Sequence, residues 1–272
     1  NVSKTFPGVK ALDQINLRVK RGSVHALMGE NGAGKSTLMK ILYGIYIPDE
    51  GGELILDDKP FKPGRPIDAI RRGLTMVPQE ISPAANLTIA DNFYLGREIT
   101  KGKFFLNQKA MNEQASAILK ELGVPMDVTE KMSDVSVAKA QLVAIATAVS
   151  NDVKVIIMDE PTTALTENEV DQLYRIIETV KARGIAIIFI SHKLDEVFRV
   201  SDEITVIRDG QYVDTKPTKE VTKEQLISMM VGRDMSEMFQ RERFELSDEI
   251  VLEIKHFTRE GKYQDINFAV RK

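Results

Sequence analysis

The sequence predicts an α/β fold that carries an inserted helical segment. A glycine-rich stretch at residues 29–37 lies between a short apolar run and a helical pattern. A second apolar run is followed directly by Asp159 and Glu160, and a third is followed directly by Ser191 and His192. Because ligands bind where the strands of an open α/β sheet end, these three observations predict both the fold class and the position of a site.

The glycine-rich stretch matches the phosphate-binding pattern G-x-x-x-x-G-K-[ST]. Residues 24–28 are expected to form a buried strand before it, and residues 36–43 a helix after it. A glycine-rich turn without a ligand is the alternative, which the full spacing and both flanking elements disfavour.

A loop of this kind binds phosphate through its backbone. Glycines let it curl so that N–H groups face phosphate oxygens, and the helix N-terminus adds partial positive charge. Lys35 is expected to reach the β- and γ-phosphates, and Ser36 to hold Mg²⁺. The loop residues expected to bind the nucleotide are Gly29, Glu30, Asn31, Gly32, Ala33, Gly34, Lys35, Ser36 and Thr37.

Composition narrows the class of protein. The 272 residues and the hydrophobic content of 43% suit one or two globular domains. The net charge of −3 and the pI near 5.8 argue against a nucleic-acid partner.

The sequence has no cysteine, which excludes disulfides, and no signal peptide is predicted. The longest unbroken apolar run, Ile185–Ile190, is too short to cross a bilayer. Since the first residue is Asn1, we expect a piece trimmed from a longer chain.

Short strands are expected in the first third of the chain. Residues 11–19 alternate apolar and polar side chains, which predicts a half-buried strand. Phe6, upstream of it, can either stack on a nucleobase or serve as a packing aromatic. Residues 53–56 and 74–77 predict further strands. The second of these is followed by Gln79, whose amide oxygen can coordinate Mg²⁺ or orient a water molecule.

Residues 87–150 change to helical periodicity, and we expect an all-helical insert there. Asn107 can cap a helix that runs to Leu122, and Ser136 can cap a second helix with an apolar face. Residues 167–183 predict a long amphipathic helix after the insert.

The sheet is expected to resume at residues 153–158, directly before Asp159 and Glu160. Asp159 can hold Mg²⁺ directly or through water, and Glu160 can polarise the attacking water as a general base. Solvated acids at a capped strand end are the alternative, and the upstream phosphate loop disfavours it. The strand at residues 185–190 brings His192 to the same edge, where it can contact a γ-phosphate. A structural histidine is the alternative there.

The end of the chain predicts a repeat. Residues 241–249 are dense in charge and are expected to form a linker. After them, residues 256–260 parallel residues 1–5, and residues 265–272 parallel residues 14–21. An internal repeat at this distance indicates a tandem protein, and chance similarity of two amphipathic strands is the alternative.

The phosphate loop, the strand-end glutamine, the acid pair and the strand-end histidine occur in the order found in ATP-binding cassette ATPases. The sequence resembles that family over essentially the whole chain to about residue 240. The resemblance implies a P-loop NTPase core with an N-terminal antiparallel β subdomain and an α-helical subdomain inserted at about residues 87–150. It also implies that the protein binds and hydrolyses ATP with Mg²⁺.

Each motif then takes a role from the family. Residues 29–37 match its Walker A loop, Gln79 its Q-loop, Asp159 and Glu160 its Walker B pair, and His192 its switch histidine. Phe6 matches its base-stacking aromatic. The residues with an implied catalytic role are Lys35, Gln79, Glu160 and His192, and those implied to hold Mg²⁺ are Ser36, Gln79 and Asp159.

A finer resemblance is to importers of monosaccharides. Residues 161–166 match the family's D-loop, and Thr166 stands where many members have aspartate. This variant, together with residues 29–40 and the partial repeat, is similar to importers of the ribose, galactose and xylose type. In those importers the ATPase subunit contains two cassettes in one polypeptide.

The resemblance implies a cassette at residues 1–240, a linker at 241–249 and the start of a truncated second cassette at 250–272. The implied partners are transmembrane permease subunits, contacted near residues 79–95, a second cassette and, indirectly, a solute-binding protein. No nucleic-acid partner is expected. The protein is expected to lie peripherally on the cytoplasmic face of the inner membrane, and this piece is expected to need a partner cassette for turnover.

The signature segment departs from the family's L-S-G-G-Q, because residues 135–139 are V-S-V-A-K. Ser136 is kept, as a helix cap and a phosphate contact. Ala138 replaces the glycine that packs on the γ-phosphate of a facing cassette, which puts one of the two composite ATP sites in doubt. Two alternatives stay open: a soluble cassette ATPase of the translation-factor or DNA-repair kind, and a module that holds ATP as a structural clamp. The absence of a basic linker or long coiled-coil arm disfavours the first, and Glu160 with His192 disfavours the second.

Overall fold

The structure is a computed structural model that describes all residues except 103–104, 151 and 233–247. It divides into two compact units, Asn1–Arg233 and Asp234–Lys272. The first unit contains an eight-stranded sheet in the order β1-β2-β12-β11-β3-β10-β9-β6. These strands are β1 (Val2–Phe6), β2 (Val9–Ile15), β3 (Val24–Met28), β6 (Leu74–Val77), β9 (Val155–Asp159), β10 (Ala186–Ile190), β11 (Glu203–Arg208) and β12 (Gln211–Pro217).

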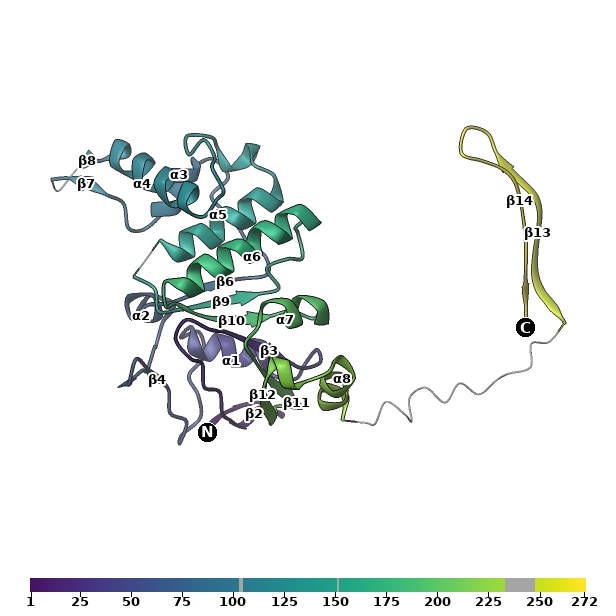
Figure 1. Ribbon diagram of the computed structural model, residues 1–272, viewed down its shortest axis with the longest axis horizontal. Helices are drawn as coiled ribbons and strands as arrows, with labels where there is room; N and C mark the ends of the chain where they lie inside the picture. Colours follow the sequence, from purple (N-terminus) through teal and green to yellow (C-terminus); the bar gives the residue numbers. More distant parts are fainter. Residues whose placement is uncertain (103–104, 151, 233–247) are drawn as a thin grey trace. The chain divides into compact units, whose positions relative to one another are not determined.

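Helices cover both faces of this sheet (Figure 1). α5 and α6 pack on one face of β6, β9 and β10, and α1 packs on the other. The α-helices of the unit are α1 (Lys35–Leu42), α2 (Pro66–Arg71), α3 (Ile89–Tyr94), α4 (Gln108–Glu121), α5 (Val137–Val149), α6 (Glu167–Ala182), α7 (Leu194–Val200) and α8 (Lys223–Val231). The predicted strands at residues 24–28 and 74–77 are confirmed with those bounds, and the predicted helix at 36–43 begins and ends one residue earlier.

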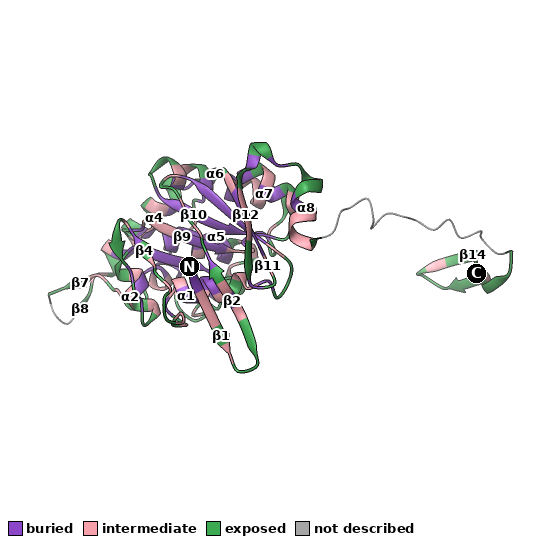
Figure 2. Ribbon diagram, turned by 90° about the horizontal axis from the view of Figure 1, so that it is seen from below, coloured by how far each residue is buried: buried purple, intermediate pink, exposed green. Residues whose placement is uncertain are grey.

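The strands at the centre of the sheet are largely apolar because both of their faces are covered. β10 pairs in parallel with β3 and β9, and β9 pairs in parallel with β6. Ile156 and Met158 face the layer of α5 and α6, whereas Ile157 faces α1. Figure 2 shows these buried strands in the middle of the first unit. Their carboxyl ends consequently meet at one edge, where the predicted site lies.

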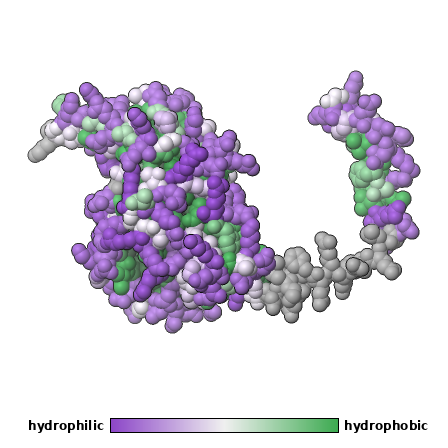
Figure 3. Space-filling view, viewed as in Figure 1, coloured by the Kyte–Doolittle hydropathy of each residue, from purple (hydrophilic) through white to green (hydrophobic). Residues whose placement is uncertain are grey.

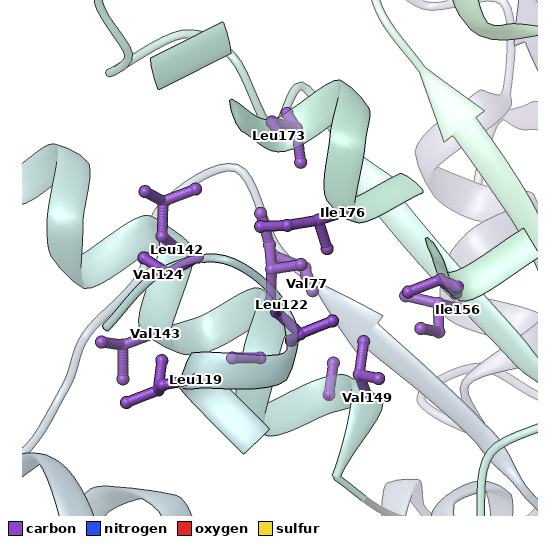
Figure 4. Packing of buried hydrophobic residues seen from close by; sticks show 14 of the residues in the cluster. Val77, Leu119, Leu122, Val124, Leu142, Val143, Val149, Ile156, Leu173 and Ile176 are labelled. Atoms are coloured by element: carbon purple, nitrogen blue, oxygen red, sulfur yellow. The ribbon is translucent and has the colours of Figure 1, made fainter. Parts of the chain in front are cut away.

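The insert packs as a helical layer beside α6. Figure 4 shows Leu119 of α4 and Leu142 of α5 in the same apolar cluster as Ile176 of α6. The expectation of an all-helical insert was wrong, because β7 (Thr100–Lys101) and β8 (Phe105–Leu106) form a short antiparallel hairpin within it. Strands of two residues are too short to show a period in the sequence.

The predicted caps of the insert are confirmed. Asn107 caps α4 and Ser136 caps α5, and each side chain accepts a hydrogen bond at 3.3 Å from the backbone N–H three residues later. α3 was not predicted, although Thr88 and Asp91 form a capping box at its start. That helix has six residues, so its apolar face spans too few turns to give a periodic signal.

Two predicted strands are shorter than expected. β2 ends at Ile15, although Leu17 still packs against the core. The strand expected at residues 53–56 is reduced to β4 (Ile55–Leu56), which pairs with β5 (Lys59–Pro60). Apolar alternation in the sequence reports burial of one face, and it does not show whether a neighbouring strand supplies ladder hydrogen bonds.

The described part of the second unit is an antiparallel hairpin of β13 (Ile250–Arg259) and β14 (Tyr263–Arg271). Most of its apolar side chains are exposed. Of the predicted linker at residues 241–249, residues 241–247 lie outside the described residues.

The second hairpin repeats local structure of the β1–β2 hairpin. Gln14 and Asp265 occupy matching positions, and both have a positive φ of 52°. The N–H of this residue donates a hydrogen bond of 2.9 Å to a side-chain hydroxyl, which belongs to Ser3 in the first hairpin and to Thr258 in the second. The asparagine two residues later accepts from a backbone nitrogen at 2.8 Å in each. The repeat in the sequence is thus accompanied by a repeat of hydrogen bonding.

The surface of the first unit is mostly hydrophilic on the face that Figure 3 shows. Its exposed large apolar side chains include Phe105, Ile47 and Val137. Within the described residues, the helices are all too short or too polar to cross a membrane.

Candidate functional site

The predicted phosphate loop connects β3 with α1 and packs closely against strand β2 and the turn between β11 and β12. Gly34, directly before α1, has a φ of 103°, and a Cβ there would lie 2.8 Å from the carbonyl oxygen of Ala11. The N–H of Gly210 donates to the carbonyl of Ala33 at 3.1 Å, which ties the loop to the turn between β11 and β12. The loop therefore holds a curled path that a side chain at Gly34 would obstruct.

Lys35 reaches back across the loop. Its Nζ donates to the carbonyl oxygens of Gly29 at 2.7 Å and Glu30 at 2.9 Å. Burial lowers the pKa of Lys35, while the negative charges of Asp159 and Glu160 act in the opposite direction. The phosphate loop and the acid pair consequently share one edge of the sheet, as expected.

Asp159 is the last residue of β9 and pairs with Ile190 of β10. Burial raises the pKa of its carboxyl, the neighbouring charge of Glu160 raises it further, and Lys35 lowers it. A bound cation would relieve both the desolvation of this carboxylate and its repulsion from Glu160.

Glu160 lies between two polar side chains from neighbouring strand ends. Gln79, which follows β6, donates its amide to Oε2 of Glu160 at 3.0 Å. His192, which follows β10, has its Nδ1 3.3 Å from Oε1. Since β6, β9 and β10 are parallel neighbours, their ends bring all three predicted residues together. The carboxylate is thus oriented from both sides.

The backbone also directs Glu160. Its φ is 47°, and its N–H donates to the carbonyl of Ile190 at 2.9 Å, so the chain turns directly after β9 while staying bonded to β10. The side chain of Glu160 is 23% exposed, and that of His192 is 64% exposed. A carboxylate in this position can accept a proton from water, and the histidine can reach a ligand outside the sheet.

The donors available for a metal ion are oxygen atoms: the hydroxyl of Ser36, the carboxylate of Asp159 and the amide of Gln79. Because the amide nitrogen of Gln79 donates to Glu160, its amide oxygen is the atom that would face a cation. Within the described part of the chain, no three His, Cys, Asp or Glu residues form a metal-holding group by themselves. The set fits Mg²⁺, which binds one or two carboxylates and completes its shell with water and phosphate oxygens.

Two predicted nucleotide-binding residues have other contacts. Phe6 packs edge-to-face on Tyr46 with ring centroids 5.2 Å apart, and Nζ of Lys4 lies 5.5 Å from the Phe6 centroid. Ser136 lies at the start of α5, and no hydrogen bond between described residues joins it to the phosphate loop. The base-stacking role of Phe6 and the phosphate contact of Ser136 stay predictions.

Two buried polar residues of the first unit form hydrogen bonds that were not expected from the sequence. His25 of β3 is fully buried, with Nε2 2.6 Å from the hydroxyl of Thr205, and burial lowers its pKa to about 4. Glu196 of α7 accepts hydrogen bonds from Thr162 and Ser191. A histidine inside an apolar strand was a usable signal, whereas a helix as short as α7 shows too few turns to reveal its buried face.

Comparisons with known proteins agree with this geometry. The family model described as ABC transporter matches residues 12–163. A putative ribose/galactose/methyl galactoside import ATP-binding protein of Geobacillus kaustophilus is 47% identical over all of this chain and 54% of its own length. The galactose/methyl galactoside import ATP-binding protein MglA of Mannheimia succiniciproducens is 48% identical over all of this chain and 54% of its own length. The chain thus spans about half the length of these curated relatives.

Solved structures show the same fold. The ATP-binding cassette MJ1267 of an ABC transporter, in its ADP conformation, superposes with a TM-score of 0.72 at 25% identity, covering 88% of this chain and 96% of that one. A nucleotide-free cassette from an ABC transporter gives a TM-score of 0.71 at 27% identity, covering 86% and 94%. The predicted fold class is therefore confirmed, and this chain belongs to the ABC transporter family of ATP-binding cassettes.

Proposed function

We propose that this cassette binds ATP with Mg²⁺ and hydrolyses it at the edge formed by the ends of β6, β9 and β10. The observation that carries the proposal is the position of Glu160, whose carboxylate lies 3.0 Å from the amide of Gln79 and 3.3 Å from the ring of His192. The charge of this carboxylate also acts on Lys35 of the phosphate loop. A general base and a phosphate anchor therefore share one edge, as phosphoryl transfer requires.

Each of these residues has a proposed role in hydrolysis that follows from its position in the site. Lys35 and the N–H groups of the loop neutralise the transferring phosphoryl group. Glu160 orients the attacking water and accepts its proton, and Gln79 and His192 hold the carboxylate in place while His192 contacts the γ-phosphate. Mg²⁺, when bound by Ser36 and Asp159 with Gln79, supplies positive charge to the phosphate oxygens.

The longer protein is proposed to use this ATPase to energise uptake of a monosaccharide through a membrane permease. The support comes from two relatives: a putative ribose/galactose/methyl galactoside import ATP-binding protein at 47% identity and a galactose/methyl galactoside import ATP-binding protein at 48% identity. The permease contact is proposed near residues 79–95, with a solute-binding protein acting indirectly. The assembly is proposed to place the cassette on the cytoplasmic face of the inner membrane.

A second cassette is proposed to complete the ATP site. The repeat of hydrogen bonds between the β1–β2 and β13–β14 hairpins supports a cassette at 1–240, a linker at 241–249 and the start of another cassette at 250–272. Ser136 and Ala138 would face the phosphate loop of that second cassette. Because Ala138 carries a methyl group where close approach is needed, we propose one competent and one impaired ATP site.

The test is hydrolysis by a protein that contains both cassettes, with and without Glu160→Gln. Loss of a general base typically lowers the rate by about 10²–10⁴, so nearly all turnover should vanish while ATP still binds. Glu167→Gln, an exposed acid at the start of α6, is the matched control and should leave the rate unchanged. Substantial turnover in Glu160→Gln would contradict a single competent site.

Transport is tested with the same variant in vesicles that contain a permease. ATP-driven uptake of a monosaccharide should be lost in Glu160→Gln and kept in the control. ATP hydrolysis that no permease stimulates would favour the soluble cassette ATPase, and tight ATP binding without hydrolysis in the two-cassette protein would favour the structural clamp.

A further inference from the structure

A buried carboxylate contacts the two segments that follow β9 and β10 at the predicted catalytic edge. Glu196, in the first turn of α7, is 7% exposed. Its Oε2 accepts hydrogen bonds from the hydroxyls of Thr162 and Ser191, each at 2.8 Å. The Nζ of Lys193 lies 3.0 Å from Oε1 of Glu196 and 3.4 Å from the Thr162 hydroxyl. One side chain therefore joins the segment after β9 to the segment after β10.

The two hydroxyls stand next to predicted catalytic residues. Thr162 follows Glu160 by two residues, and Ser191 directly precedes His192. Both hydroxyl residues are buried, at 2% and 4% exposure. Because water has little access to these groups, the carboxylate depends on them and on Lys193 for its hydrogen bonds. Movement of either segment away from Glu196 would leave a buried charge poorly satisfied.

We infer that Glu196 is a positioning residue that couples residues 161–166 to residues 191–193, and so sets the placement of Glu160 relative to His192. Its significance for ATP hydrolysis rests on the proposed function, whereas the coupling itself does not. The competing explanation is that Glu196 is an acid at the start of α7 that stabilises only its own helix. The two explanations differ in whether a substitution in one segment changes the local stability of the other segment.

Amide hydrogen exchange measured on this chain distinguishes these two explanations. Thr162→Val and Ser191→Ala each remove one donor and leave the carboxylate in place. Each is expected to speed amide exchange in the other segment, residues 191–194 for Thr162→Val and residues 161–166 for Ser191→Ala. Loss of a hydrogen bond to a charged group predicts an increase of roughly 10-fold or more.

Matched variants control for general loosening of the fold. Thr179→Val removes a hydroxyl of α6 that donates to the carbonyl of Arg175, and it should change exchange in neither segment. Glu196→Gln should speed exchange in both segments, because an amide has one acceptor oxygen and cannot accept from Lys193 on one side and from both hydroxyls on the other. Asp195→Asn, on the same turn but with a side chain 85% exposed, should not.

The inference is overturned if each variant speeds exchange only in its own segment, or if Asp195→Asn acts like Glu196→Gln. Titration with a fluorescent ATP analogue tests the proposed function separately. Failure of the chain to bind the analogue would count against the proposed function, and it would leave the result on coupling intact.

Discussion

Substitution of Gly29 by alanine should destabilise the first unit through a clash that the structure locates. Gly29 has a φ of 155°, and a Cβ there would lie 2.2 Å from the carbonyl oxygen of Ile207 and 3.0 Å from Cβ of Ala33. Non-bonded heavy atoms are ordinarily about 3.5 Å apart, so the loop or the end of β11 has to move by about 1 Å. The obstacle is backbone, which cannot rotate away as the end of a side chain can.

Gly32→Ala is the matched control, because Gly32 also has a positive φ, 86°, but nothing lies within 4 Å of its Cβ position. Both variants should lose about 1–3 kcal/mol of unfolding free energy from the unfavourable φ. Only Gly29→Ala adds overpacking, which costs about 1–3 kcal/mol more. For a unit of this size each 1 kcal/mol lowers Tm by about 2–4 °C, so its Tm should be lower by about 2–12 °C than that of the control.

The assay is thermal and urea unfolding of both variants, followed by circular dichroism, beside the unsubstituted chain. An equal or larger loss of stability in Gly32→Ala would refute the reasoning, because it would show that the contact with Ile207 does not decide the cost.

Three further predictions concern other residues of the same unit. Lys35→Met should lower ATP affinity roughly 10- to 150-fold, because hydrogen bonds to charged groups contribute about 1.5–3 kcal/mol; an unchanged titration with a fluorescent analogue would contradict this. Burial lowers the pKa of His25 from 6.5 in the unfolded chain to about 4 in the folded one. The contribution of His25 to the free energy of unfolding is therefore fully present above about pH 6.5 and is lost as the pH falls toward 4. The total loss is about 3 kcal/mol, and His25→Gln should remove most of this pH dependence in urea unfolding; an equal slope in the variant would count against it. Ser136→Ala should cost about 1 kcal/mol in the same assay, since it removes the cap of α5, and unchanged stability would argue against the cap.

The elements with long apolar patterns could be predicted closely from the sequence. β3 and β6 have the expected bounds, and α6 ends one residue before the expected limit. The placement of Gln79, Glu160 and His192 at one edge also follows from the sequence, because each comes after an apolar run and parallel strands end together. Chain order and strand type thus carry much of the information about the site.

What could not be predicted depends on contacts between distant parts of the chain. The pairing of β7 with β8 and the end of β2 at Ile15 depend on contacts between strands, which leave no mark in local periodicity. The buried position of Glu196 depends on Thr162 and Ser191, which are 34 and 5 residues away in the sequence. A charged residue on a short helix is ordinarily exposed, so only its partners reveal its burial.

The most direct measurement is steady-state ATP hydrolysis by a protein that contains both cassettes, with Glu160→Gln and Glu167→Gln in parallel. Because a facing cassette is proposed to complete the site, the unsubstituted protein should hydrolyse ATP. The rate should fall by about 10²–10⁴ in Glu160→Gln, which should still bind ATP, and stay unchanged in Glu167→Gln. Turnover by Glu160→Gln at the rate of the unsubstituted chain would contradict the central claim that this carboxylate, held between Gln79 and His192, is the catalytic base.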